Sequence, residues 1–317
     1  MRPLRYIPPR GPGERTLVEV TCRTVQGLFL LKPGSDLHRR LLGVLGKAQQ
    51  RTQTALHSIN VMTTHLHMLV SVLDAHELSS FMHYFAGNSA REICRLRAWG
   101  DRVWARRYRG IVTSDEEEVQ VARLRYCLEN GCKEGLVMSP LDWPGLSTAA
   151  TLYNGYRQLE GDWIDRTGLY RARQRGKDVS ERDFLERVPV RLAPLPCWQT
   201  MGWKQRRDQA RELIADIERE TRARHRHQGT RPLGVRKVLA VETLARPAAL
   251  KKTPAPLFHA TREARRLLVE AYRLFVAAYV AASQAYRAGQ LDVTFPEGSF
   301  RPPGGWVPHP ARARAPD

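Results

Sequence analysis

The stretch TALHSINVMTTHLHMLVSV (residues 54–72) decides the fold, because it holds two apolar runs separated by Thr63 and Thr64. Each run has the length and the β-branched content of a strand, and the two threonines indicate a tight turn between them. His65 and His67 interrupt the second run, which is otherwise suited to a core strand. Because residues two apart in a strand point to the same face, the two imidazoles are expected to lie side by side.

The flanking sequence extends this hairpin into a larger sheet. A strand is predicted over 17–25 and another around 110–114, and helices over 34–52, 75–100 and 115–131. The order β-α-β-β-α-β-α predicts an α+β fold, with an antiparallel, ferredoxin-like sheet and helices on one side of it. We expect this domain to cover residues 16–150, after a flexible N-terminus at 1–15.

Residues 151–317 are predicted to form a basic, mainly helical C-terminal extension. It contains a charged helix over 204–229, a segment broken by Pro and Gly up to about residue 260, an Ala-rich helix over 262–288 and an irregular tail. We expect the Ala-rich helix to pack on the core. Because its arginine clusters have no ligand-like partner in the first half, the extension is expected to recognise DNA and not to take part in catalysis.

The charge of the chain favours a polyanionic partner. Fifty-one Lys and Arg against 32 Asp and Glu give a net charge of +19, with 42% hydrophobic residues. Such an excess favours nucleic acid first and an anionic membrane surface second. A genome rich in G and C would also raise the arginine content. The five cysteines form no C-x-x-C pair, which argues against a disulfide framework and a structural zinc site. With no signal peptide and no long uncharged run, we expect a cytoplasmic, nucleoid-associated protein without a membrane partner.

A candidate metal site combines the histidine pair with the helix predicted at 115–131. Tyr126 and Asn130 are four residues apart and therefore share a helical face. Asn130 offers an amide oxygen that, with His65 and His67, completes a two-imidazole, one-oxygen set for a divalent cation, and Tyr126 would lie beside a phosphate held there. The alternative is structural: two buried core histidines and an ordinary packing tyrosine.

A basic stretch before the fourth strand is a candidate DNA-binding surface. It consists of Arg102, Trp104, Arg106, Arg107, Tyr108 and Arg109. Arginines interleaved with aromatic rings suit a phosphate track with base stacking, and the alternative is a solvated basic surface. Tyr108 is the rival nucleophile to Tyr126, but it has no oxygen ligand one helical turn away.

His-Leu-His on a strand followed by Tyr-x-x-x-Asn on a later helix resembles the HUH single-strand DNA transposases, in particular the REP-associated tyrosine transposase branch of the IS200-like enzymes. HSINVMTTHLHMLVSV resembles the family's strand-turn-strand, and residues 100–148 resemble its later block in order and spacing. The resemblance covers roughly residues 16–150. Thr63-Thr64 stands where this family usually has Pro-Asn, and NGCKEGLV (130–137) replaces its Asn-Pro run.

The resemblance implies the HUH endonuclease fold and a metal-dependent transposase that cleaves and joins single-stranded or hairpin DNA. Tyr126 would form a 5′-phosphotyrosine intermediate, on Mg²⁺ or Mn²⁺ held by His65, His67 and Asn130. A domesticated relative that binds such DNA without cutting it is the alternative function. A replication initiator or relaxase fits less well, because neither a tyrosine-first order nor a helicase is present. Both a monomer and a homodimer are compatible with the resemblance.

Overall fold

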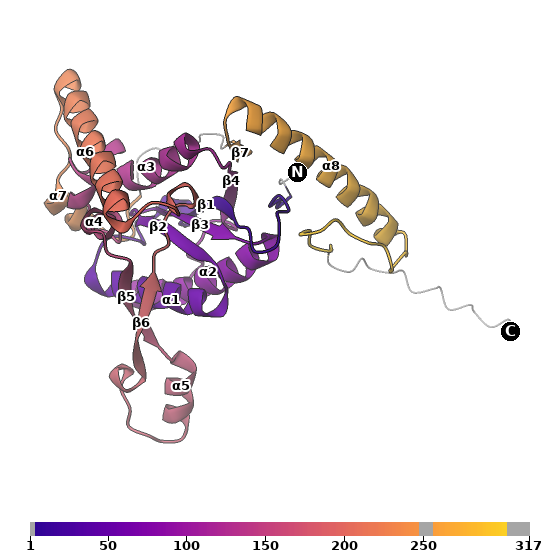
Figure 1. Cartoon of the computed structure of the whole chain (residues 1–317). Coiled ribbons are helices and arrows are strands. Elements are labelled where there is room, and N and C mark those ends of the chain that lie inside the picture. Colours follow the sequence, from indigo (N-terminus) through magenta and orange to yellow (C-terminus); the bar gives the residue numbers. More distant parts are fainter. Residues whose placement is uncertain (1–3, 247–255, 303–317) are drawn as a thin grey trace.

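The computed structural model describes residues 4–246 and 256–302, and its centre is a five-stranded sheet in the order β2-β3-β1-β4-β7 (Figure 1). The strands are β1 Thr16–Arg23, β2 Ala55–Val61, β3 His65–Val72, β4 Arg109–Thr113 and β7 Phe258–His259. Four strands pair antiparallel, and the short β7 adds to the edge of β4 in parallel. The predicted hairpin at 54–72 is therefore the β2–β3 pair.

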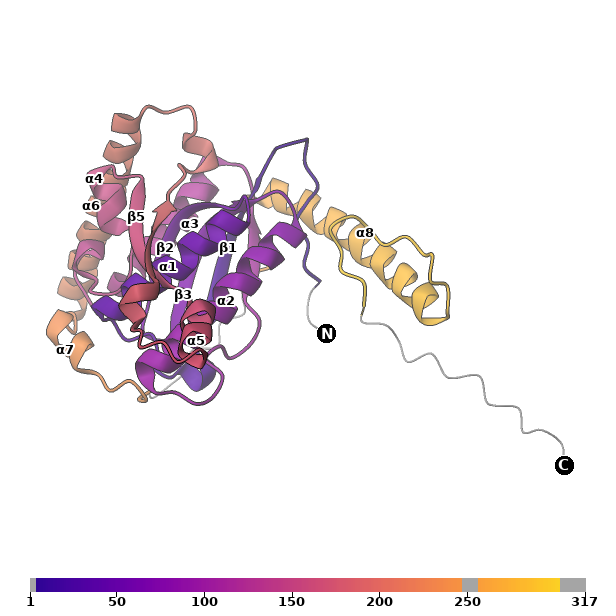
Figure 2. The same cartoon turned by 90° about the horizontal axis from the view of Figure 1, so that it is seen from below.

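Helices cover both faces of this sheet. One face carries α1 Ser35–Arg51 and α2 Ala75–Arg97, whose buried residues join those of β1 and β3 in one apolar cluster (Figure 2). The other face carries α3 Glu117–Lys133, which packs with Leu17 of β1 and Leu69 of β3 in a second cluster. The predicted α+β class and antiparallel sheet are thus confirmed, but the expectation of helices on one side only is corrected, because α3 crosses to the opposite face.

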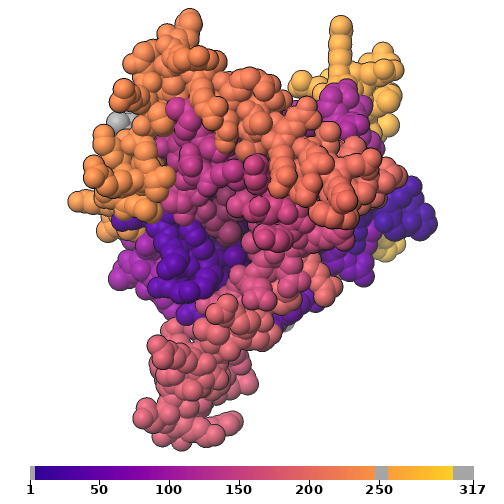
Figure 3. Space-filling model, turned by 60° about the vertical axis from the view of Figure 1, so that its left-hand side comes forward, coloured from indigo at the N-terminus to yellow at the C-terminus, as the bar shows by residue number. Residues whose placement is uncertain are grey.

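The C-terminal half is mainly helical, as predicted, and it also contains a hairpin that the sequence did not indicate. Its helices are α4 Ala149–Asn154, α5 Arg166–Gln174, α6 Trp203–Gln228, α7 Val235–Ala240 and α8 Arg262–Arg287. β5 Gln158–Ile164 and β6 Leu185–Arg191 form an antiparallel pair whose connection carries α5 away from the body (Figure 3). Over the whole of the described residues there are also four short 3-10 turns: η1 Val25–Gly27, η2 Pro140–Asp142, η3 Glu181–Phe184 and η4 Pro196–Trp198.

The β5–β6 hairpin lies directly against α1, and glycines make that contact possible. A Cβ on Gly43 would lie 2.1 Å from the carbonyl oxygen of Asp162, and a Cβ on Gly161 would lie 2.0 Å from the Gly43 nitrogen. No side chain fits in that space, so strand and helix backbones approach each other closely here. The C-terminal half is therefore packed on the first half through α1.

The Ala-rich helix α8 packs on the core with only part of its length. Leu268, Val269 and Tyr272 contact the α1–α2 cluster, and Tyr272 and Tyr6 have ring centroids 5.8 Å apart. Farther along, Leu274 is 68% exposed, and the helix extends away from the body (Figure 1). The expected packing of this helix therefore holds for its N-terminal part.

Several expectations fall partly outside the described residues. These are the first three residues of the flexible N-terminus, positions 247–255 of the Pro- and Gly-broken segment, and the tail from 303. The flexibility of residues 1–15 and the division at residue 150 stay predictions. Within the described ranges, no helix combines the length and apolarity needed to cross a bilayer.

The neutral imidazole of His57 connects β2 to the segment after β6 through hydrogen bonds at its ring nitrogens. Its Nδ1 lies 3.1 Å from the carbonyl oxygen of Ala193, and its Nε2 lies 2.7 Å from Oγ of Ser71. Burial lowers the pKa of His57 from 6.5 to about 4. Between these two values the unfolded chain binds the proton more tightly than the folded protein, so this residue makes stability fall as the pH drops through that window.

We therefore predict that His57→Gln flattens the acid side of the stability profile. The difference in free energy of unfolding between about pH 7 and about pH 4 should shrink by up to about 3 kcal/mol. Urea titrations at several pH values measure this, with His83→Gln on the exposed side of α2 as the control. An unchanged pH dependence in His57→Gln would contradict the neutral, buried state of this imidazole.

Candidate active site

The two predicted histidines lie on the sheet face that α3 covers. His65 and His67 are the first and third residues of β3, and their ring centroids are 5.1 Å apart in an edge-to-face arrangement. On the same face, Asn60 and Thr21 are the cross-strand neighbours of His67 from β2 and β1. The period of the strand thus places the pair side by side, as the sequence predicted.

Tyr126 of α3 lies against this pair. Its ring centroid is 5.3 Å from that of His67, again edge to face. The guanidinium of Arg123 and the ammonium of Lys133 lie 5.1 Å and 4.4 Å from the Tyr126 ring centroid. Burial and the charge of Glu19 raise the pKa of Tyr126, while Arg123 acts in the opposite direction. The phenol is therefore protonated at neutral pH, and the two cations favour its phenolate.

The orientation of His67 is fixed by a buried carboxylate. Nδ1 of His67 lies 3.0 Å from Oε1 of Glu19, and both side chains are almost fully buried. An ionised carboxylate only accepts hydrogen bonds, so Nδ1 of His67 carries the proton and donates it to Glu19. Nε2 of His67 is then the ring nitrogen that Glu19 leaves for another contact.

Glu19 is held ionised by the groups around it. Burial disfavours its charge, but His259 and His67 beside it outweigh burial and lower the pKa of Glu19 to about 2. Nε2 of His259 lies 2.9 Å from Oε2 of Glu19, and Nη1 of Arg123 lies 3.7 Å from the same oxygen. His259 belongs to β7, which pairs with β4 at Thr113. A residue from the C-terminal half thus contacts the carboxylate that orients His67.

His65 is neutral, and a hydrogen bond orients its ring. Burial, together with the charges of His67 and Arg23, lowers the pKa of His65 to about 3. Its Nδ1 lies 2.9 Å from Oγ1 of Thr64, in the turn between β2 and β3. The threonine therefore occupies one nitrogen of His65 and leaves Nε2 for a second contact.

The amide of Asn130 is turned toward its own helix. Its Nδ2 donates to the carbonyl oxygens of Tyr126 and Cys127, at 2.7 Å and 3.4 Å. The Cys127 carbonyl also accepts from Nδ2 of Asn60, at 2.7 Å. Oδ1 of Asn60 is buried and has no hydrogen-bond partner among the described residues. An amide oxygen without a partner thus lies on the face of His67, from a residue that the sequence did not single out.

These donors fit a divalent cation. Two imidazoles whose Nδ1 atoms are engaged, together with a buried amide oxygen, make up a mixed N/O set of the kind that divalent cations bind. Over the residues that the structure describes, no group of three or more His, Cys, Asp or Glu side chains could hold a metal ion. An ion at this site would therefore need an amide oxygen, from Asn130 or Asn60, to complement His65 and His67.

Most of the predicted basic stretch lines a groove on the opposite face of the sheet. The groove runs between α2 and the loop before β4, and Arg102, Trp104, Arg106, Arg107 and Tyr108 line it together with Arg5 and Arg91. Arg109 departs from this set. It pairs with Thr21, the cross-strand neighbour of His67, so it lies on the histidine face.

Tyr108 is separated from the histidines by the sheet. Its ring packs against the α1–α2 cluster, and the guanidinium of Arg5 lies 4.9 Å from its centroid. Burial raises the pKa of Tyr108 to about 12. Tyr108 therefore does not belong to the group of side chains around His65 and His67.

Sequence reasoning missed Glu19, Asn60 and His259, and the three differ in how visible they were. Glu19 is the one acid in LVEVTCR (17–23), on the same strand face as Leu17 and Thr21, so an acid in a buried strand was the available signal. Asn60 lies near the end of β2, two residues before Met62, and its sequence context is that of an ordinary polar residue at a strand end. His259 follows a Pro- and Ala-rich segment, and nothing local indicates that it joins the sheet.

Part of the chain is similar to known proteins. Residues 34–126 match the family model described as transposase IS200 like. Two solved structures are similar in part: a REP-associated tyrosine transposase bound to a REP hairpin, at 16% identity over 45% of this chain and 82% of that one, with a TM-score of 0.35; and a protein assigned as a transposase from Deinococcus radiodurans, at 18% identity over 38% and 95%, with a TM-score of 0.29. No curated protein matches the chain.

We predict that Glu19→Gln weakens the binding of Mn²⁺ by about 10- to 100-fold, because His67 loses the acceptor that fixes its ring and tautomer. Calorimetric titration of the full-length protein with Mn²⁺ measures this. Glu92→Gln is the matched control, since Glu92 is an equally buried carboxylate whose partners are Arg95 and Arg166. Equal Mn²⁺ affinity in Glu19→Gln and the wild type would show that this carboxylate serves packing alone.

Proposed function

Because residues 34–126 match the IS200-like transposases, we propose that this protein is a transposase-like enzyme that cleaves and rejoins single-stranded, hairpin-forming DNA through a covalent tyrosine intermediate. The observation that carries the proposal is the contact of Tyr126 with His67, at 5.3 Å between ring centroids, where His67 itself contacts His65. The nucleophile, the candidate metal ligands and two cations lie together on one sheet face.

The reaction uses these residues in separate roles. Oη of Tyr126 attacks the phosphorus, the bond from phosphorus to the 3′ oxygen breaks, the phenolic proton passes to solvent and the departing 3′ oxygen takes up a proton. The product is a 5′-phosphotyrosine and a free 3′-hydroxyl, and the ester energy is kept for rejoining. Arg123 and Lys133 beside the Tyr126 ring stabilise negative charge on its oxygen.

The histidines hold the metal in this proposal. Nε2 of His65 and of His67, with an amide oxygen of Asn130 or Asn60, would bind Mg²⁺ or Mn²⁺, which supplies charge neutralisation at the scissile phosphate. Glu19 accepts the Nδ1 proton of His67 and so favours the tautomer that this requires, and the Thr64 hydroxyl can accept the Nδ1 proton of His65. Asn130 needs its amide to leave the helix carbonyls, whereas Oδ1 of Asn60 is already without a partner among the described residues.

A second candidate function is DNA binding without cleavage. The inward-turned amide of Asn130 favours it, since the predicted oxygen ligand is engaged at its nitrogen end with its own helix. The basic groove would serve either function, because it lies on the face away from Tyr126. The two functions differ in one observable, the covalent protein–DNA adduct.

We expect Tyr126→Phe to bind hairpin DNA and Mn²⁺ as the wild type does and to form no SDS-resistant adduct, because only the nucleophilic oxygen is removed. His65→Ala and His67→Ala should lose Mn²⁺-dependent cleavage while retaining most DNA binding, which is spread over many arginines. Denaturing gels of protein incubated with labelled hairpin DNA measure both.

Tyr108→Phe is the matched control for this series and should form the adduct normally. An adduct in Tyr126→Phe would assign the nucleophile to another residue. Hairpin binding by the wild type without any adduct, at all Mn²⁺ concentrations, would instead favour the non-cleaving function.

The groove should supply part of the salt dependence of DNA binding. We predict that Arg106→Ala with Arg107→Ala lowers the slope of log K against log salt by about 0.7 for each phosphate that is no longer neutralised. Arg39→Ala, whose guanidinium pairs with Asp36 and Asp162, is the control. Fluorescence anisotropy over a range of salt concentrations measures the slope, and an unchanged slope in the double variant would remove the groove from the DNA path.

A further inference from the structure

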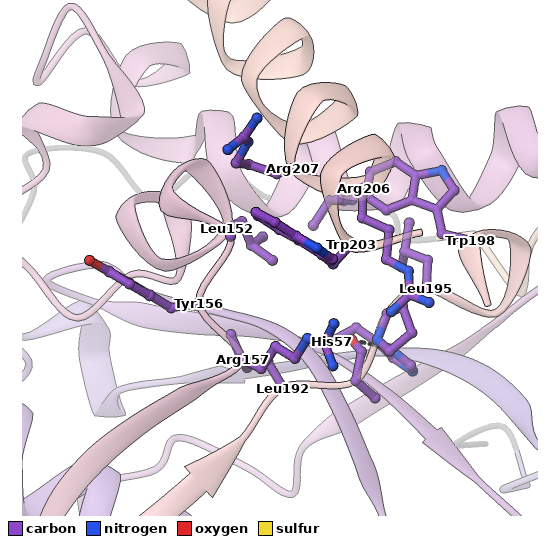
Figure 4. A pocket seen from close by; sticks show the side chains of 14 residues that line it. His57, Leu152, Tyr156, Arg157, Leu192, Leu195, Trp198, Trp203, Arg206 and Arg207 are labelled. Carbon is purple, nitrogen blue, oxygen red and sulfur yellow. Dashed lines mark hydrogen bonds between the residues drawn. The ribbon is translucent and has the colours of Figure 1, made fainter. Parts of the chain in front are cut away.

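A second cavity lies between elements of the C-terminal half and the edge of β2. Its walls come from the α4–β5 connection, the segment after β6 and the start of α6, with His57 of β2 and Leu124 of α3 on the inner side (Figure 4). Apart from these two, its lining residues lie outside the segment 34–126 that matches the transposase family. None of the roles proposed above uses it.

One exposed aromatic ring lies over an apolar floor in this cavity, and a second stands at its edge (Figure 4). Trp203 is 48% exposed and Tyr156 is 65% exposed, although large aromatic side chains are normally buried. Leu152, Leu192 and Leu195 line the interior, and Trp203 lies across the space from Leu192 and Arg157 (Figure 4). Flat, accessible rings above apolar side chains suit a planar, partly apolar ligand that stacks.

The rim of the cavity is cationic. The Lys204 ammonium and the Arg207 guanidinium lie 5.9 Å and 5.3 Å from the Trp203 ring centroid. Arg207 pairs with Asp208, whereas Arg157 is exposed and has no acidic partner among the described residues. Arg157 is therefore an exposed cation that a ligand phosphate can reach. Stacking rings beside such a cation favour a nucleotide over an uncharged aromatic ligand.

The cavity and the candidate active site share their supporting elements. Leu124 is on α3, two residues before Tyr126, and Nε2 of His57 contacts Ser71 at the end of β3 opposite to His65. The six residue-to-residue steps from His65 to Ser71 span about 20 Å at about 3.3 Å per step. A DNA strand of a few nucleotides covers that distance.

We infer that this cavity, defined by Trp203, Tyr156 and Arg157, binds one unpaired base of a single-stranded extension next to the hairpin, with the base stacked on Trp203 and its phosphate at Arg157. This inference rests on the proposed single-strand DNA substrate. It assigns to the C-terminal half a contact that reads the single strand and not the stem.

The test couples a protein variant to a change in the DNA. Hairpins with an oligothymidine extension on the 5′ or the 3′ side carry one abasic nucleotide at successive positions, and affinity is measured by anisotropy. Wild-type protein should lose about 5- to 150-fold in affinity at one position, the value of one stacked base. Trp203→Ala should bind the intact extension more weakly by a similar factor and should no longer respond to that abasic position.

Trp203→Phe keeps a stacking ring and should retain the position dependence, while Arg157→Ala should weaken binding at every position equally. Tyr170→Ala is the control and should behave as the wild type, because Tyr170 on α5 is as exposed as Tyr156 but does not line the cavity. Unaltered far-ultraviolet circular dichroism and thermal midpoints establish that Trp203→Ala is folded. If Trp203→Ala shows the same abasic profile as the wild type, or if no position matters, the base-binding assignment is wrong.

The outcome is separable from that of the proposed function. Adduct formation at saturating DNA should be equal in Trp203→Ala and the wild type, because the cavity contributes affinity and not chemistry. If the wild type shows no abasic response but forms a normal adduct, the proposed enzyme stands and the base-binding cavity does not. A preserved response with no adduct in the wild type would leave a DNA-binding protein with this cavity.

Discussion

The carboxylate of Glu19 is buried on the sheet face that carries the histidines, and the arrangement of the site depends on how its charge is compensated. A buried carboxylate without partners would be strongly destabilising, so the groups that surround it have to be held in place. His67, His259 and Arg123 provide this compensation from three separate elements, β3, β7 and α3. The same contacts fix the tautomer of His67 and bring α3, with Tyr126, close to the histidines.

This dependence explains why the C-terminal half is not a simple appendage. β7 has two residues, yet it adds to the sheet edge and brings His259 to Glu19, and α8 follows at once with Thr261 as its N-cap. Oγ1 of Thr261 also donates to Glu116, at the start of α3, at 3.0 Å. The expectation from the sequence concerned only the arginine clusters of residues 151–317, and the contact of His259 with the carboxylate that orients His67 was not predicted.

The sequence predicted those parts of the fold that depend on local periodicity. The order of the first seven elements follows from runs such as ALHSINV and HLHMLVSV, and the structure confirms it. The β5–β6 hairpin was missed because Gln158–Ile164 and Leu185–Arg191 are short, charged and separated by α5. Their pairing is stabilised by contact with Gly43 and Gly46 of α1, which lie more than a hundred residues away and leave no local signal.

The site shows the same division between local and distant information. Strand and helix periods were enough to place His65 beside His67 and Tyr126 one turn before Asn130, but they could not orient the Asn130 amide, whose nearest acceptors are the carbonyls of its own helix. Asn60 was invisible because its significance comes from cross-strand register with His67, a property of pairing and not of spacing. The groove and the histidine pair meet at one end of β1, where Arg23 pairs with His65 and the backbone of Ala105 bonds to Arg23. On the proposed function, a hairpin bound in the groove therefore needs to pass only the end of β1 for its single strand to reach Tyr126.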